Sequence, residues 1–249
     1  MELRSAFNEW GHFTDGRFAD RQWLLAKWEV CEGVVWPQVK IDLMLGLIAE
    51  RLDLGLNDYF VDCGCGGGWI LKNLGPHAGY AIGLDFSGEM IGNAVTIDAG
   101  DVLLQGEIGR LPFKTGSLDK ALCYFVLINM MDDTYVQRSI LDMMRVLKPG
   151  GLLLIGQLPD RAGSQAYDTA KAAYLEFCRQ TYDLGKDLRE VGRMPQKLFD
   201  VPGLLAFLDR EAIVYQKMPS FNPFYRPGEP VTVDWRFDLL LKKDNFRSS

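Results

Sequence analysis

The feature that most constrains this sequence is a run of seven residues, 62–68, that contains four glycines. An apolar, strand-like stretch (residues 59–61) precedes the run, and a helix-like stretch (residues 69–74) follows it. Glycine allows a positive φ and lets a ligand approach the main chain closely. In open α/β sheets, ligands bind at such turns, beyond the carboxyl ends of the strands. The run therefore predicts an α/β fold with a candidate ligand-binding turn, although a tight turn without a ligand would show the same glycines.

The remainder of the chain alternates between strand and helix patterns. We expect strands at residues 80–84, 102–104, 120–125 and 152–155, and helices at residues 87–97 and 134–147. Lys148, Pro149 and two glycines end the second helix. Helices of this length between strands indicate right-handed crossovers and a mostly parallel sheet. Two further strands are expected at residues 212–217 and 234–241.

The segments around this core have a different character. Residues 1–36 are rich in aromatic side chains, and residues 160–185 form a long helix-like stretch that breaks the alternation. A helix over residues 196–208 is expected to be interrupted at Pro202 and Gly203. We therefore predict three parts, which are an N-terminal helical cap at 1–36, an α/β core at 37–157 and 196–249, and a helical cap insertion at 158–195.

Composition argues against several functions. The 249 residues include 27 basic and 33 acidic side chains, a net charge of −6, which disfavours nucleic acid or a membrane surface as a partner. The odd number of cysteines (five), most of them inside apolar runs, favours free thiols in the cytoplasm, and no apolar stretch resembles a signal peptide or a membrane span. Two histidines and the Cys63-x-Cys65 pair do not supply a paired set of four ligands, so no metal is expected.

The glycine run does not fit the dinucleotide-binding fingerprint. Counting from Gly64 and Gly66, the position of the third glycine is occupied by Trp69, which disfavours a nicotinamide-dependent oxidoreductase. At the end of the next predicted strand, Asp85 stands where the diol of a bound ribose would lie.

Five motifs occur in a fixed order, at residues 61–68, 83–87, 105–113, 117–129 and 147–151. Together they resemble the class I S-adenosylmethionine-dependent methyltransferases, particularly the small-molecule branch that includes the ubiquinone-biosynthesis type. The resemblance covers roughly residues 40–156. It implies a three-layer α/β sandwich with a mostly parallel, seven-stranded, Rossmann-like sheet, and S-adenosyl-L-methionine as the cofactor.

The resemblance also implies a set of cofactor-binding residues. They are Asp62, Gly64, Gly66, Gly68, Asp85, Phe86, Met90, Gly106, Glu107, Ile108, Cys123 and Tyr124. Asp62 and the loop glycines would hold the methionine half, and Asp85 would bind both ribose hydroxyls. Phe86 or Met90 would lie against the adenine ring. Glu107 stands where the family usually has aspartate, and it would accept a hydrogen bond from the adenine amine.

The expected activity is methyl transfer to a small-molecule acceptor by in-line displacement. His12 is a candidate general base because its reference pKa of about 6.5 suits proton removal near neutrality, although a surface or packing role is also open. The Pro-Pro-aromatic element of enzymes that methylate base amines is absent at residues 123–126. A cofactor-binding partner subunit without catalysis is the alternative. The sequence leaves the acceptor and the oligomeric state open.

Overall fold

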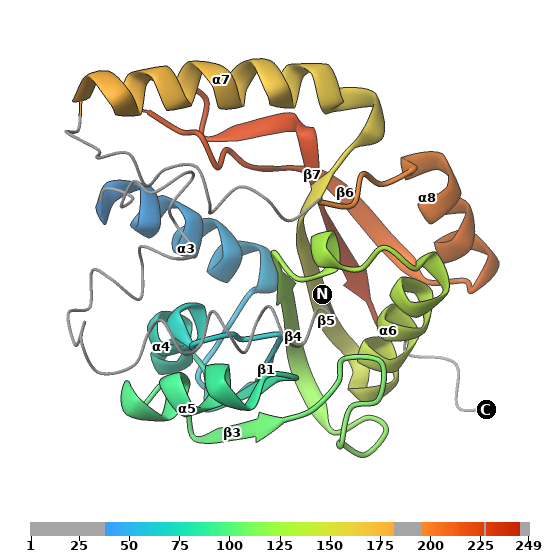
Figure 1. The fold of residues 1–249 in the computed structure, drawn as a ribbon. Helices are drawn as coiled ribbons and strands as arrows, with labels where there is room; N and C mark the ends of the chain where they lie inside the picture. Colours follow the sequence, from blue (N-terminus) through green and yellow to red (C-terminus); the bar gives the residue numbers. More distant parts are fainter. Residues whose placement is uncertain (1–37, 182–195, 227, 245–249) are drawn as a thin grey trace.

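A computed structural model describes residues 38–181, 196–226 and 228–244 (Figure 1). Its strands are β1 (Tyr59–Cys63), β2 (Tyr80–Asp85), β3 (Val102–Gln105), β4 (Leu118–Tyr124), β5 (Leu147–Pro159), β6 (Val214–Phe221) and β7 (Thr232–Lys242). Its α-helices are α3 (Gln38–Leu52), α4 (Trp69–Leu74), α5 (Gly88–Thr96), α6 (Asp133–Val146), α7 (Ser164–Thr181) and α8 (Val201–Arg210). Short 3-10 turns lie at η1 (Gly75–His77), η2 (Leu127–Asn129) and η3 (Arg161–Gly163).

The strands form one seven-stranded sheet in the order β3-β2-β1-β4-β5-β7-β6. Strands β1 to β5 pair in parallel, and β7 runs antiparallel to both of its neighbours, β5 and β6. The strand order reverses between β1 and β4, which is the position where open α/β sheets bind ligands. The predicted fold, a mostly parallel seven-stranded α/β sandwich, is confirmed.

Helices cover both faces of the sheet. Helices α3, α4 and α5 lie on one face and α6 and α8 on the other, so the molecule has three layers (Figure 1). Side chains along β4 alternate between the two cores, since Leu122 and Tyr124 pack on the α3 side and Cys123 packs on the α6 side. Because both faces are buried, the central strands read as nearly continuous apolar runs.

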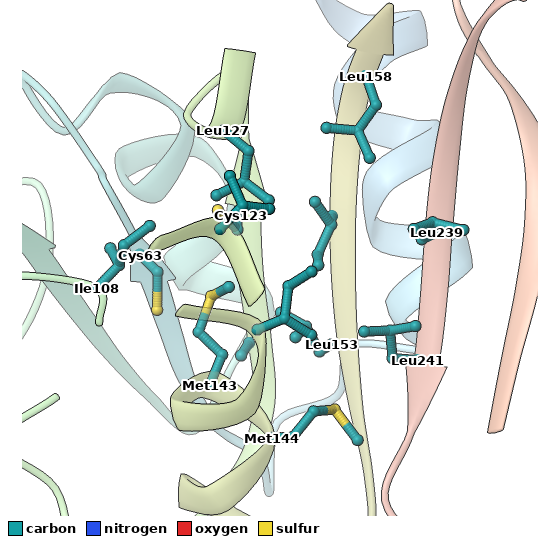
Figure 2. Close-up of a cluster of buried hydrophobic side chains, with 14 of the residues drawn as sticks. Cys63, Ile108, Cys123, Leu127, Met143, Met144, Leu153, Leu158, Leu239 and Leu241 are labelled. Carbon is teal, nitrogen blue, oxygen red and sulfur yellow. The ribbon is translucent and has the colours of Figure 1, made fainter. Parts of the chain in front are cut away.

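The core on the α6 side is the larger of the two. Figure 2 shows Met143 and Met144 of α6 near Leu153 of β5, with Leu239 and Leu241 of β7 beyond that strand. Burial of a large apolar side chain stabilises a protein by about 1.5–3 kcal/mol, so this layer holds α6 firmly against the sheet. No helix in the described ranges is long and apolar enough to cross a membrane.

Helix starts follow their capping residues. The Ser87 hydroxyl accepts from Met90 N at the start of α5, and the Asp132 carboxylate accepts from Thr134 N at the start of α6.

The predicted helix over residues 196–208 is wrong in its start. Helix α8 begins at Val201 after Asp200, and Pro202 lies in its first turn, where its missing N–H costs no hydrogen bond. Residues 196–200 are instead not helical, and Phe199 forms an isolated parallel β-bridge with Asp160.

Strand β5 is longer than predicted. It extends from Leu147 to Pro159 rather than over residues 152–155, and α7 follows after η3. Its extra residues pair with β4 at Leu147 and with β7 at Pro159. The division of the chain into a core and two caps stays a prediction.

Candidate functional site

The carboxyl ends of β1 and β2 meet at the glycine loop. Main-chain N–H groups of Gly64 and Cys65 donate to Leu84 O at 2.7 and 3.0 Å. One carboxylate oxygen of Asp85 accepts from Gly66 N, and the other accepts from Ser87 N, both at 2.9 Å. Asp85 therefore ties the glycine loop to the start of α5.

Three loop glycines have backbone conformations that other residues rarely adopt. The φ angles are 86° at Gly64, 53° at Gly66 and 81° at Gly68. A Cβ at Gly64 would lie 2.5 Å from a Val126 methyl carbon, and one at Gly68 would lie 2.4 Å from Ala99 Cβ. Gly64 and Gly68 are thus required by close packing as well as by their positive φ, which adds a structural role to the predicted one.

Asp62 is a buried carboxylate at the end of β1. Among the described residues no hydrogen bond reaches its side chain, and only 2% of the residue is exposed. Burial raises the pKa of Asp62 to about 7, and the nearby Asp85 carboxylate adds to the shift. Burial also raises the pKa of Asp85, which the amides of Ser87 and Gly66 oppose. A cationic group near Asp62 would stabilise its ionised form.

The segment after β3 completes the loop cluster. Gly106 N donates to Asp85 O at 2.8 Å, and the Gln105 amide donates to Phe86 O at 3.1 Å, so the ends of β2 and β3 are joined. Phe86 is half-buried, whereas Met90 in α5 is buried. The structure thus brings the predicted ribose and adenine residues to one edge of the sheet.

Glu107 and Ile108 lie in different environments. Glu107 is exposed, and Ile108 is buried in the core near Cys63 (Figure 2). The buried side chain of Ile108 therefore fixes the segment that follows β3. The Glu107 carboxylate is open to a ligand or to solvent.

The two predicted residues of β4 are enclosed. The Cys123 thiol lies in the core on the α6 side, and burial raises its pKa, with Asp62 adding to the shift. Tyr124 lies on the opposite side, where its hydroxyl is 3.4 Å from an Asp238 carboxylate oxygen, and burial raises its pKa as well. The half-buried residues at this strand end are the next two, Phe125, which has a φ of 61°, and Val126.

Sequence reasoning missed a buried polar network behind Tyr124. The Asp238 carboxylate of β7 accepts from Gln157 N at 2.8 Å and from the Ser220 hydroxyl at 2.5 Å. It also pairs with Arg51 of α3. The one sequence signal is that Asp238 interrupts an apolar strand pattern.

Several predictions concern residues beyond this cluster. His12 and the cap at residues 1–36 lie outside the described residues, and His77 is exposed on η1. In the predicted cap insertion, Tyr167 of α7 contacts Trp235, with ring centroids 5.5 Å apart. Cys63, Cys65 and Cys123 are free thiols, and within the described ranges no three His, Cys, Asp or Glu side chains form a metal-binding group.

Comparison with known proteins identifies the matched region. Residues 61–155 match the family model described as a methyltransferase domain. A malonyl-[acyl-carrier protein] O-methyltransferase of Erwinia billingiae is 31% identical over 99 residues, 39% of this chain and 38% of that protein. A tRNA (carboxymethyluridine(34)-5-O)-methyltransferase of Arabidopsis thaliana is 30% identical over 144 residues, 58% of this chain and 29% of that protein. The chain thus spans well under half the length of these relatives.

Solved structures share the fold at low identity. The magnesium protoporphyrin IX methyltransferase of Synechocystis PCC 6803, solved with S-adenosylmethionine, has a TM-score of 0.61 and 14% identity, with 97% of this chain and 95% of that chain covered. An S-adenosylmethionine-dependent methyltransferase of Methanosarcina mazei has a TM-score of 0.56 and 22% identity, covering 80% of this chain and 97% of that one. Residues 61–155 of this chain therefore match a methyltransferase domain, and the solved methyltransferase structures share the fold of the chain.

Proposed function

We propose that this chain transfers the methyl group of S-adenosylmethionine to an oxygen atom of a small carboxylate-bearing acceptor. The observation that carries the cofactor part is the placement of two buried carboxylates, Asp62 and Asp85, on either side of a glycine loop at the strand-order reversal.

The residues fit the chemistry of this cofactor. S-adenosylmethionine carries an ammonium and a sulfonium group, and a cation beside the buried Asp62 carboxylate would offset the cost of its burial. The Asp85 carboxylate lies at the end of β2 and accepts from the main-chain amides of Gly66 and Ser87. A carboxylate has about four lone-pair sites, so it can also accept from a ribose hydroxyl. Glu107, exposed at the end of β3, would accept from the adenine amine.

The bound cofactor supplies an activated methyl group. The contribution of the protein is then to orient the donor and acceptor and to exclude water, since orientation alone supplies several kcal/mol of the barrier reduction. The segment after β4, with Phe125 and Val126 half-buried beside Gly64, is the side from which we infer that the acceptor approaches. A carboxylate acceptor is already ionised at neutral pH, so it needs no general base, and His12 would be required only for a hydroxyl acceptor.

The relatives support an oxygen acceptor. The Erwinia protein is named for O-methylation of a malonyl group, and the Arabidopsis protein is named for O-methylation of carboxymethyluridine. Malonyl and carboxymethyl groups share a carboxyl function. The net charge of −6 favours a small acceptor over a polynucleotide. RNA is the second candidate, because the Arabidopsis relative matches the larger share of this chain.

Calorimetry and a transfer assay test this proposal in sequence. S-adenosylhomocysteine, the demethylated product, should bind the purified chain with one-to-one stoichiometry. Methyl-labelled S-adenosylmethionine should then label a malonyl thioester or another small carboxylate, with the label released by mild alkali as expected for a methyl ester. Label in total tRNA alone would support the second candidate. Binding without any transfer would indicate a partner subunit, and absence of binding would contradict the proposed function.

A further inference from the structure

One face of α6 runs along the segment that follows β3. Arg138, Asp142 and Arg145 are spaced by four and three residues, which places them on the same face of the helix. This face adjoins the one that enters the core through Met143. It is not part of the sequence motifs at the glycine loop, and the cofactor residues described above do not include it.

Two charged side chains of α6 form hydrogen bonds with the main chain of residues 111–113. Asp142 accepts from Leu111 N at 2.5 Å, and Arg145 donates to Phe113 O at 2.8 Å and to Leu111 O at 3.0 Å. Arg145 also donates to Asp142 at 2.7 Å. Two charged side chains thus satisfy three main-chain groups of the segment and also pair with each other.

The contact continues toward the ligand side of the segment. A Cβ at Gly109 would lie 3.0 Å from the Arg138 guanidinium, so the main chain passes directly against Arg138. Burial raises the pKa of Tyr135, the Glu107 carboxylate adds to the shift, and Arg138 and the main chain of Gly109 oppose it. Residues 107–113 are therefore held along α6 from Tyr135 to Arg145.

Apolar side chains also hold residues 107–113 against the core. Ile108 and Leu111 are buried in the cluster that contains Met143, and Figure 2 shows Ile108 beside Cys63. The polar contacts of Asp142 and Arg145 add direction to this apolar anchor, because a hydrogen bond fixes the orientation of a peptide group and apolar contact does not. Glu107 lies at the β3 end of the segment, between Gly106, whose N–H donates to Asp85 O, and the buried Ile108.

Resting on the proposed function, we propose that Asp142 and Arg145 are positioning residues for the adenine end of the cofactor. They hold residues 106–113 so that Glu107 and the neighbouring main chain can recognise the base. They do not touch the ligand. Their loss should change how well the site recognises adenine, and not only how stable the fold is.

The test measures binding of two ligands to three variants. S-adenosylhomocysteine and its inosine analogue, in which a carbonyl replaces the adenine amine, are titrated into the wild-type chain and into Asp142→Asn, Arg145→Gln and Arg145→Lys. We expect the wild-type chain to prefer the adenine ligand. In Asp142→Asn and Arg145→Gln, affinity for S-adenosylhomocysteine should fall about tenfold, as for loss of a hydrogen bond to a charged group, and the preference for adenine should shrink. Arg145→Lys should retain part of the affinity for S-adenosylhomocysteine and part of the preference for adenine.

Asp119→Asn is the matched control. Asp119 also accepts from a main-chain amide, Tyr59 N at 3.0 Å, and from a cation, Lys148 at 2.7 Å, but at the amino ends of β1 and β4. This variant should lose a similar amount of thermal stability while both affinities stay at the wild-type level.

Three outcomes would overturn the inference. Wild-type affinity in a folded Asp142→Asn, weaker binding with an unchanged preference for adenine, or the same binding loss in Asp119→Asn would each assign α6 a structural role alone. Failure of the wild-type chain to bind S-adenosylhomocysteine is a distinct result, and it would remove the proposed function together with this inference.

Discussion

Replacing Asp62 by asparagine should make the ligand-free protein more stable while weakening cofactor binding. Asp62 is buried, receives no hydrogen bond from the described residues, and lies near a second buried carboxylate, Asp85. Asparagine has nearly the same shape as a protonated aspartic acid and carries no charge. The substitution therefore removes the cost of the buried charge and leaves the packing in place.

The size of the effect follows from the pKa. Burial and Asp85 raise the pKa of Asp62 from 3.8 to about 7. One pKa unit corresponds to ~1.4 kcal/mol, so the ionised carboxylate costs the folded state up to about 4 kcal/mol. The neutral amide of the Asp62→Asn variant keeps the burial cost of a neutral polar group, which protonated Asp62 shares, so that cost cancels in the comparison.

The stability difference between Asp62→Asn and the wild-type chain should increase with pH. The folded-state pKa of Asp62 is raised, so the unfolding free energy of the wild-type chain is highest below pH 4, where Asp62 is protonated in both states. It falls as the pH rises toward about 7, because only the unfolded state loses the proton easily in that range. The unfolding free energy of Asp62→Asn should thus exceed that of the wild-type chain by ~2 kcal/mol at pH 5.5 and by ~4 kcal/mol at pH 8. Removal of an ionised group that is well paired would have the opposite sign.

Urea unfolding of the ligand-free chain at these two pH values measures both differences. Calorimetry with S-adenosylmethionine at pH 8 then measures the cost to binding, since the cationic ligand no longer meets a carboxylate. Equal unfolding free energies at pH 8, or a difference that does not change with pH, would refute the argument that the buried Asp62 charge destabilises the free protein. Unchanged cofactor affinity would refute its role in binding.

Three further substitutions test other parts of the structure. Asp85→Ala should weaken S-adenosylhomocysteine binding by ~1.5–3 kcal/mol in calorimetry, and unchanged affinity in a folded variant would remove the ribose assignment. Arg51→Ala leaves the fully buried Asp238 without its cation and should lower the unfolding free energy by ~3–5 kcal/mol, whereas a loss below ~1 kcal/mol would show that the pair is solvated. Gly92→Ala, in α5 with open space around its Cβ position, should raise stability by up to ~1 kcal/mol, and a decrease would contradict the open surface.

Local sequence signals predicted the part of the fold that carries the cofactor site. Apolar runs bounded by glycine placed β1 and β2 within a few residues, and the position of Asp85 at a strand end followed from those boundaries. These elements are predictable because their cause is local. A strand buried on both faces must be apolar, and a turn with positive φ at Gly64 and Gly68 requires glycine.

The errors occurred where the cause is a contact between distant segments. Pro202 suggested a break within a helix, but the helix starts there because residues 196–200 run along the ends of other strands, with Lys197 N donating to Ile128 O at 2.7 Å. The length of β5 could not be predicted either, since its added residues are stabilised by pairing with β4 and β7. A sequence pattern does not show which strand lies next to which.

Two deeply buried aspartates of the sheet show the same limit for function. Asp62 and Asp238 both interrupt apolar strands, between Val61 and Cys63 and between Phe237 and Leu239, so the sequence does not distinguish them.

Their surroundings in the structure do. The Asp238 carboxylate receives donors from Gln157 N, Ser220 and Tyr124 and pairs with Arg51. Burial raises the pKa of Asp238, and these four partners oppose the rise, so its charge already has partners inside the protein. The Asp62 carboxylate receives none from the described residues. A buried acid that receives no donor from the described part of the chain destabilises the free protein, and a cationic ligand that binds there recovers that energy as affinity. The two asparagine substitutions should therefore change the stability of the free protein in opposite directions. Asp238→Asn should destabilise the free protein, and Asp62→Asn should stabilise it at the expense of binding.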